Sequence, residues 1–159
     1  MTRAWPEPVE RVAAFMRAAG AEARLEEFEH GTPTAEDAAR AVGCGLSQIV
    51  KSLVFDCDGR AIVVMVPGDE RASSRKVRSA GGCGRARIAG SEYVEQVTGF
   101  EPGAVAPFPL PRVWRVFIDR SLLRHATVWI GAGSRRHLAA LAPSELMRLA
   151  RAEAIDAVG

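Results

Sequence analysis

The chain has 159 residues, of which 48% are hydrophobic and 25% are charged, and its formal net charge is +2. A chain of this length suits one domain with a sizeable core, and we expect residues 1–159 to form a single domain. No apolar run approaches the roughly 20 residues that a membrane-spanning helix needs, and the first residues lack the apolar stretch of a signal peptide. The mildly basic balance permits a nucleic-acid partner without requiring one.

The cysteines argue for a reducing compartment. Cys44, Cys57 and Cys83 are an odd number, and they lack the Cys-x-x-Cys spacing of a zinc site or a redox motif. We therefore expect three reduced thiols and a cytoplasmic location, without a disulfide framework or a bound metal.

The first third of the chain predicts two helices and a short strand. Apolar residues at helical spacing predict a helix over 8–19, and residues 24–29 alternate weakly, as a strand does. Thr34 has the character of an N-cap, with Asp37 in the capping-box position, and Gly43 is placed to end this second helix.

The middle of the chain predicts a hairpin and two short helices. The β-rich runs 49–55 and 61–66 are joined by Asp56-Cys57-Asp58-Gly59, a typical hairpin connection. Helices are predicted over 73–80 and 91–98, each followed by glycine.

The last third begins with a long Gly/Pro segment over 99–111, and structureless loops of this length are often functional. Strands are predicted over 113–119, 127–130 and 154–158, with a helix over 144–151. Because helices and strands are intermixed, the sequence predicts an α/β domain with a mixed sheet.

Lys51 stands in the middle of an apolar strand, and it is one of only two lysines in the chain. Strand alternation places it on the same face as Ile49, Leu53 and Phe55. Desolvating an ammonium group is costly, so this placement suggests a cation aimed at an anionic or carbonyl group. The alternative is an edge-strand lysine with its stem on apolar surface and its head in water.

Three other features are weak signals by themselves. The turn at 131–134 follows a strand and could present backbone N–H groups to an anion, although by itself a plain turn is the more common explanation. Gly103-x-x-x-Pro107 could bring a backbone N–H close to a ligand. His137 follows the glycine turn, where a structural histidine is the common alternative.

Basic residues gather between positions 71 and 87. They read either as a solvated surface or as a patch that contacts phosphates. These residues are Arg71, Arg75, Lys76, Arg78, Arg85 and Arg87.

Taken together, the motifs resemble the YbaK/ProX family, which includes the editing domain inserted in bacterial prolyl-tRNA synthetases. The resemblance follows the family's order and covers nearly the whole chain. It rests on the segments 34–43, 48–55, 67–69, 98–108, 116–119 and 129–134.

The resemblance implies a barrel-like mixed sheet surrounded by helices, with no cofactor. It also implies trans-editing, which is hydrolysis of the ester that links a wrong amino acid to tRNA, mostly tRNA-Pro. The implied partners are aminoacyl-tRNA and possibly prolyl-tRNA synthetase, with no membrane or DNA. The family pattern assigns Lys51 and Gly103 to catalysis, and it assigns substrate binding to Thr34, Ala104, Val105, Pro107, Gly131, Gly133, Ser134 and His137.

These assignments are chemically reasonable. A lysine can hold the terminal phosphate through a charge-assisted contact, and a glycine loop can present N–H groups to the ester carbonyl as charge develops. Alanine is the first expectation for the amino acid removed, with serine, cysteine and 2-aminobutyrate as alternatives.

The arginine cluster supports a second hypothesis, a non-catalytic tRNA- or synthetase-binding module. Lys51 and the glycine turn leave a third, a phosphate-binding enzyme.

Overall fold

A computed structural model of the protein describes residues 5–32 and 34–159. Within these ranges the helices are α1 Glu7–Ala18, α2 Ala35–Val42, α3 Ser74–Gly81, α4 Ser91–Thr98 and α5 Pro143–Ala150, with short 3-10 helices η1 Leu46–Gln48 and η2 Arg120–Arg124. The strands are β1 Ala23–Glu27, β2 Val50–Cys57, β3 Arg60–Pro67, β4 Ala86–Ile88, β5 Arg115–Asp119, β6 Val128–Gly131, β7 His137–Leu141 and β8 Glu153–Ile155. No helix in the described part of the chain is long and apolar enough to cross a membrane.

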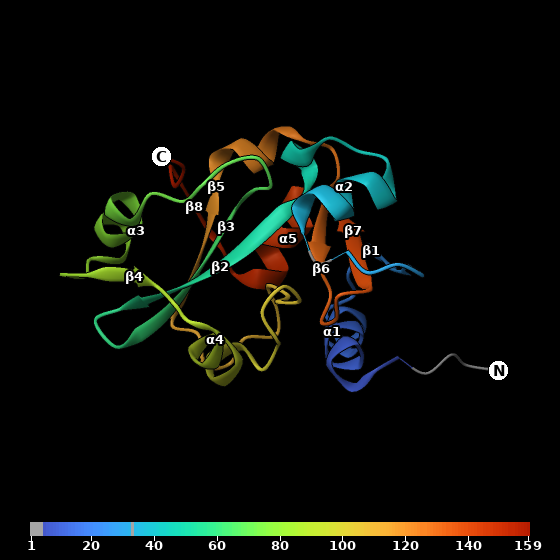
Figure 1. The fold of residues 1–159 in the computed structure, drawn as a ribbon, viewed down its shortest axis with the longest axis horizontal. Helices are drawn as coiled ribbons and strands as arrows, with labels where there is room; N and C mark the ends of the chain where they lie inside the picture. Colours follow the sequence, from blue (N-terminus) through green and yellow to red (C-terminus); the bar gives the residue numbers. More distant parts are fainter. Residues whose placement is uncertain (1–4, 33) are drawn as a thin grey trace.

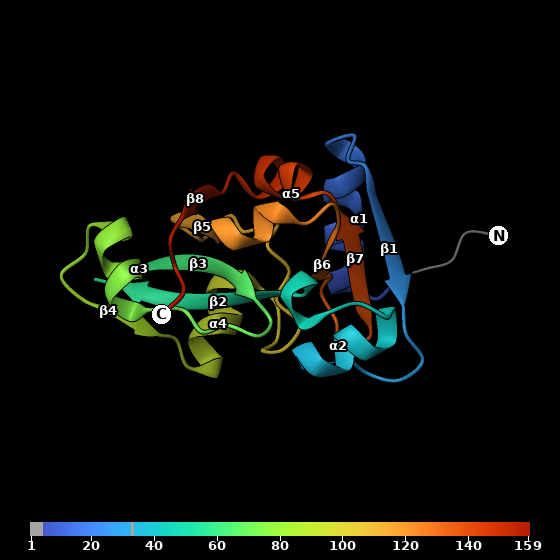
Figure 2. The same cartoon turned by 90° about the horizontal axis from the view of Figure 1, so that it is seen from above.

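The strands form two sheets, which Figures 1 and 2 show side by side. One is five-stranded with the order β4-β2-β3-β5-β8, and it mixes antiparallel and parallel pairs. The other is antiparallel with the order β1-β7-β6. A parallel bridge from Ile49 to Trp129 links the two sheets. The predicted α/β class with a mixed sheet is confirmed, and the expected barrel-like sheet is divided in two.

Three apolar clusters hold these layers together. The largest joins α1 and α5 to both sheets, and the second lies under α3 around Phe55, Val77 and Phe117. The third packs α2 against Trp129 and Leu138. This third cluster fixes the start of α2 beside the edge of β2, which is where the candidate site lies.

Several local predictions are confirmed at the level of single contacts. The Thr34 hydroxyl accepts a hydrogen bond from the Asp37 backbone N–H at 3.1 Å, and Gly43 ends α2 with φ of 73°. The hairpin turn is formed by Asp58 and Gly59, with φ of 53° and 89°. Positive φ at both central residues is what a tight turn matching the strand twist requires.

Two strands were not predicted. β4 is only three residues long, and β7 reads His-Leu-Ala-Ala-Leu, which has no β-branched residue. β7 is nevertheless the central strand of its sheet, because it pairs with β1 on one side and β6 on the other. Its extended conformation is imposed by these partners.

The expectation of three reduced thiols is wrong for two of them. Cys57 and Cys83 form a disulfide with a Cα–Cα distance of 5.6 Å, and Cys44 is free. The partners are 26 residues apart in sequence. The end of β2 and the turn after α3 meet only in the folded chain, so sequence spacing could not reveal the pair.

Candidate functional site

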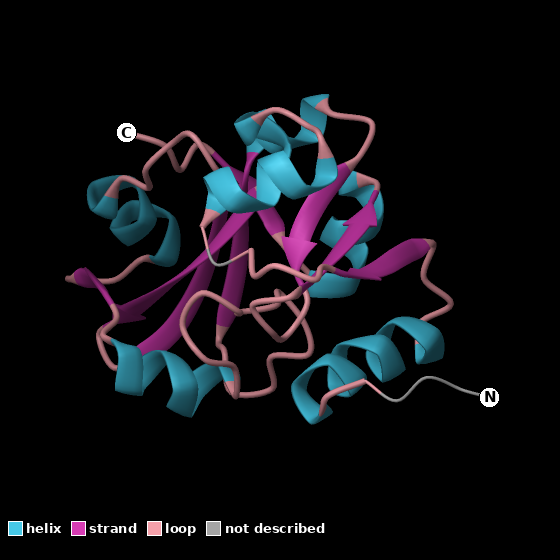
Figure 3. Cartoon of the chain, turned by 45° about the vertical axis from the view of Figure 1, so that its right-hand side comes forward, coloured by secondary structure: helices cyan, strands magenta, loops and turns pink. Residues whose placement is uncertain are grey.

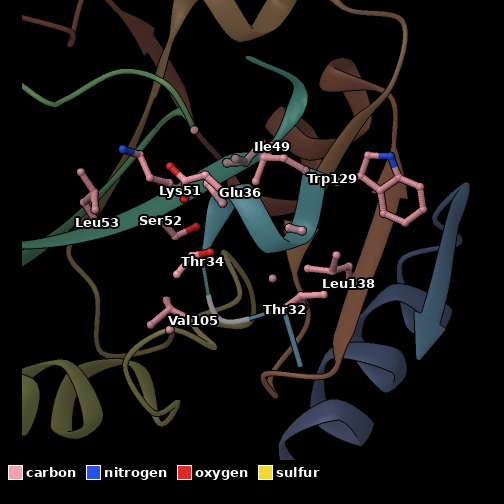
Figure 4. A pocket seen from close by; sticks show the side chains of 16 residues that line it. Thr32, Thr34, Glu36, Ile49, Lys51, Ser52, Leu53, Val105, Trp129 and Leu138 are labelled. Atoms are coloured by element: carbon pink, nitrogen blue, oxygen red, sulfur yellow. The ribbon is translucent and has the colours of Figure 1, made fainter. Parts of the chain in front are cut away.

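The candidate site lies beside β2, between the two strands that meet its outer edge. β6 reaches the start of β2 through the Ile49–Trp129 bridge, and β4 pairs with β2 only from Phe55 to Cys57. A cavity of about 410 Å³ opens between these contacts. Figure 4 shows the side chains that line it.

The walls of the cavity come from segments far apart in sequence. The start of α2 supplies Thr34 and Glu36, and the loop after α4 supplies Gly103 and Val105. In Figure 3 this loop is the pink segment between α4 and the sheets. Buried apolar side chains close one side of the cavity: Ala38, Ile49, Trp129 and Leu138.

Lys51 lines the cavity, and its ammonium group donates a hydrogen bond to the backbone carbonyl of Glu70 at 2.5 Å. The side chain is half-buried, so neither sequence interpretation describes it completely. Its stem lies on the cavity wall, while its head is held by a carbonyl of the chain itself. This tether keeps the charge at the cavity rim.

Two glycines shape the backbone that borders the cavity. Gly103 has φ of 85°, a conformation that side-chain-bearing residues rarely adopt. At Gly131 an added Cβ would lie 2.7 Å from the Val105 carbonyl oxygen. Gly131 therefore allows the loop that carries Gly103 and Val105 to pack against the end of β6.

Thr34 is at the cavity and also caps α2. Besides accepting from the Asp37 N–H, its hydroxyl donates to the Asp37 carboxylate at 2.8 Å. This hydrogen bond, followed by one from Arg40, lowers the pKa of the Asp37 carboxyl. The donor of Thr34 is thus already used within the protein.

Five of the predicted site residues therefore converge, and the others lie elsewhere. Thr34, Lys51, Gly103, Val105 and Gly131 line the cavity.

Ala104 is buried, with its neighbours on both sides at the cavity. Pro107 lines a different cavity, of about 660 Å³, near Phe15 and Trp114. Gly133 packs against the start of α1, where an added Cβ would lie 2.7 Å from the Pro8 carbonyl oxygen. A substrate-binding role for these three residues stays a prediction.

His137 is buried, and it forms a hydrogen-bonded pair with the half-buried Ser134 away from the cavity lining. The Ser134 hydroxyl lies 2.5 Å from Nδ1 of His137, and Glu27 is 3.9 Å from Nε2. The Trp5 ring meets the imidazole edge-on, with 5.4 Å between centroids. Leu138 lines the cavity, so alternation along β7 directs His137 to the opposite face. Their assignment to substrate binding also stays a prediction.

The arginine cluster is largely unpaired. Five of its arginines are exposed, and in the described chain none makes a side-chain hydrogen bond or ion pair. Lys76 differs, because it pairs with Asp156 at 2.9 Å. Unpaired arginines retain their full charge for an external anion. The five are Arg71, Arg75, Arg78, Arg85 and Arg87.

Sequence reasoning missed three polar residues of the cavity, Thr32, Glu36 and Ser52. The Thr32 hydroxyl donates to the Arg135 carbonyl at 3.1 Å. Glu36 is in the first turn of α2, where an acidic residue is ordinary helix chemistry and gives no signal of a site. Ser52 is the immediate neighbour of Lys51 but projects from the other face of β2. Its position at an unpaired strand edge depends on how the sheets assemble.

The fold defines the class of protein. A crystal structure of a candidate trans-editing enzyme for prolyl-tRNA synthetase superposes with a TM-score of 0.91 and 32% sequence identity, over 98% of this chain and 99% of that one. The model of the aminoacyl-tRNA editing domain family matches residues 29–149, and the chain belongs to that family.

Two curated proteins are similar to this chain in sequence. The uncharacterized protein YwhH of Bacillus subtilis is 38% identical over 123 residues, which are 77% of this chain and 78% of YwhH. The proline–tRNA ligase of Bacillus licheniformis is 32% identical over 118 residues, which are 72% of this chain and 21% of the ligase. The chain thus spans about a fifth of that ligase.

Proposed function

We propose that this protein is a trans-editing aminoacyl-tRNA deacylase. Its substrate is tRNA-Pro that carries a small wrong amino acid, with alanine first and serine, cysteine or 2-aminobutyrate as alternatives. One observation carries the proposal: Lys51, Gly103, Thr34, Val105 and Gly131, assigned from sequence motifs, line one cavity. Family membership gives the cavity its substrate class.

The proposed reaction is hydrolysis of the aminoacyl ester. Water adds to the ester carbonyl, the bond from that carbon to the terminal ribose oxygen breaks, and the products are the free amino acid and uncharged tRNA. The backbone N–H groups of the Gly103 loop stabilise the negative charge that develops on the carbonyl oxygen. The terminal hydroxyl of the tRNA orients the water, so no nucleophilic side chain is needed.

Lys51 has the role of holding the substrate in register. Its ammonium exchanges the Glu70 carbonyl for a phosphate oxygen of the tRNA terminus, and the new contact is stronger because both partners are charged. The apolar wall formed by Ile49, Trp129 and Leu138 receives the amino-acid side chain. The amino-acid pocket of a synthetase cannot strongly reject amino acids smaller than its own substrate. A separate, smaller hydrolytic site such as this cavity can remove them after they have been attached to tRNA.

The test is a deacylation assay with tRNA-Pro charged separately with proline, alanine, cysteine and serine. We expect selective loss of one mischarged species, and Lys51→Ala should slow it about 100-fold or more while the fold survives. The matched control is Lys76→Ala. It removes the second lysine of the chain, which does not line the cavity, and it should retain activity. A Lys51→Ala protein as active as the wild type would contradict the role given to Lys51.

A second candidate function is a non-catalytic tRNA-binding module, and the unpaired arginines in and next to α3 and β4 favour it. In the preferred account the same arginines contact tRNA phosphates while the cavity acts on the ester. The two functions are separated by the same assay. Salt-sensitive tRNA binding without loss of any ester would select the binding module.

A further inference from the structure

The pocket contains a residue that the proposed chemistry has not used. Among residues 5–32 and 34–159, the Ser52 hydroxyl oxygen is buried and has no hydrogen-bond partner. A buried polar group without a partner is costly, and native proteins rarely keep one without a reason. Ser52 lines the cavity, and in Figure 4 its side chain lies between those of Lys51 and Thr34.

The backbone of Ser52 faces the same opening. The Ile49 carbonyl accepts from the Gly68 N–H on the β3 side, whereas the Val54 carbonyl accepts from the Ala89 N–H on the opposite edge. Because N–H and C=O groups alternate along a strand, Ser52 directs its own pair to the edge that Val54 uses. β6 meets this edge at Ile49 and β4 at Phe55, so Ser52 lies in the gap between them.

The neighbouring polar groups are already engaged. The Thr34 hydroxyl both accepts from and donates to Asp37, and the Lys51 ammonium is bound to the Glu70 carbonyl. Ser52 therefore offers two oxygen acceptors at one point of the cavity wall, the hydroxyl and the backbone carbonyl. The acidic side chain of Glu36 lines the same cavity and favours a cation there.

We propose that Ser52 binds the α-amino group of the aminoacyl ester. An ammonium group has several N–H donors and no acceptor, which suits two nearby acceptor oxygens and a carboxylate. The contact lies on a group that every amino acid shares, so it anchors the substrate while the apolar wall selects the side chain. This inference rests on the proposed deacylase function and adds the recognition of an unblocked amine.

The test compares two substrates with two variants. Wild type, Ser52→Ala and Ser52→Thr are assayed on alanyl-tRNA-Pro and on N-acetylalanyl-tRNA-Pro, whose amine is blocked. Ser52→Ala should lower kcat/KM about tenfold on the free amine, the effect of one lost hydrogen bond to a charged group, and less than about twofold on the acetylated ester. Ser52→Thr keeps the hydroxyl and should retain most of the activity, as should the exposed control Ser79→Ala.

Thermal denaturation supplies an independent readout. Ser52→Ala removes a buried hydroxyl that has no partner in the free protein, so its Tm should stay at or above that of the wild type. Equal losses on both substrates, or no loss on either, would overturn the amine assignment while leaving the deacylase intact. A wild-type protein that hydrolyses no mischarged tRNA-Pro would overturn both proposals together.

Discussion

Asp119 joins the end of β5 to the C-terminal segment. Its carboxylate is 3% exposed and accepts from the backbone N–H groups of Ala157 at 2.7 Å and Val158 at 3.3 Å, as well as from both donors of Ser121. Burial alone would raise the pKa of this carboxyl, but the hydrogen bonds from Ser121, Ala157 and Val158 outweigh it and the pKa is lowered.

We therefore expect Asp119→Asn to lower the free energy of unfolding by about 2 kcal/mol at neutral pH, because charged hydrogen bonds are lost and an N–H₂ group meets other donors. A lowered folded-state pKa gives stability that is complete above the unfolded value of about 4 and is lost as pH falls through the folded value. Denaturant titrations of the wild type and of Asp119→Asn at pH 7 and pH 3 measure the difference in their free energies of unfolding. The difference between the two proteins should shrink at pH 3, and a constant difference would contradict the account.

Lys51 and Ser52 differ in how far the sequence alone predicts their place in the site. Alternation and the rarity of lysine singled out Lys51, and the structure places it at the cavity. The same strand gave no signal for Ser52, because a serine beside a lysine is unremarkable until the strand edge is seen to be open. A residue whose role depends on an unpaired stretch of strand edge cannot be recognised from the local sequence pattern.

The end of β6 and the turn that follows it contain two glycines with different roles, Gly131 and Gly133. A Cβ at Gly131 would press on the Val105 carbonyl of the cavity loop, whereas one at Gly133 would press on Pro8 at the start of α1. Gly133 also has φ of 102°, which strains any other residue.

We expect Gly131→Ala to reduce deacylation about tenfold or more and also to lower the Tm, since an added Cβ forces the backbone of the Gly103 loop to move. Gly133→Ala should lower the free energy of unfolding by about 1–3 kcal/mol and leave kcat/KM of the folded protein unchanged. Measuring kcat/KM and Tm for both variants separates the two roles. If Gly133→Ala alone impaired catalysis at unchanged Tm, the division of roles would be wrong.

Elements with strong local signals were predictable and those made by their neighbours were not. α2 begins at Thr34 and ends at Gly43 because the cap and the terminal glycine act within a few residues. β7 is alanine-rich and becomes a strand only between β1 and β6. The cavity was likewise not predictable from local sequence, because it exists only where β6 and β4 leave the edge of β2 unpaired at Ser52.

At the scale of the whole molecule, the Cys57–Cys83 disulfide closes 26 residues that include β3 and α3. Cross-linking a loop of this length stabilises the folded state by about 2–4 kcal/mol. We expect reductant or Cys83→Ser to lower the free energy of unfolding by this amount and to leave deacylation unchanged, because the cavity lies toward the other end of β2. Cys44→Ser is the matched control and should change neither. Under denaturing conditions without reductant, three titratable thiols in place of one would contradict the pairing.

Hydrolysis of the ester of mischarged tRNA-Pro by this cavity can be measured under single-turnover conditions, with each mischarged ester compared with the correctly charged one. Alanyl-, cysteinyl-, seryl- and prolyl-tRNA-Pro are each mixed with excess protein, and loss of the ester is followed. We expect the alanyl ester to be lost much faster than the prolyl ester, and we expect Lys51→Ala to abolish the difference. If the alanyl, cysteinyl and seryl esters all decay at the rate measured without protein, the proposed hydrolysis is contradicted.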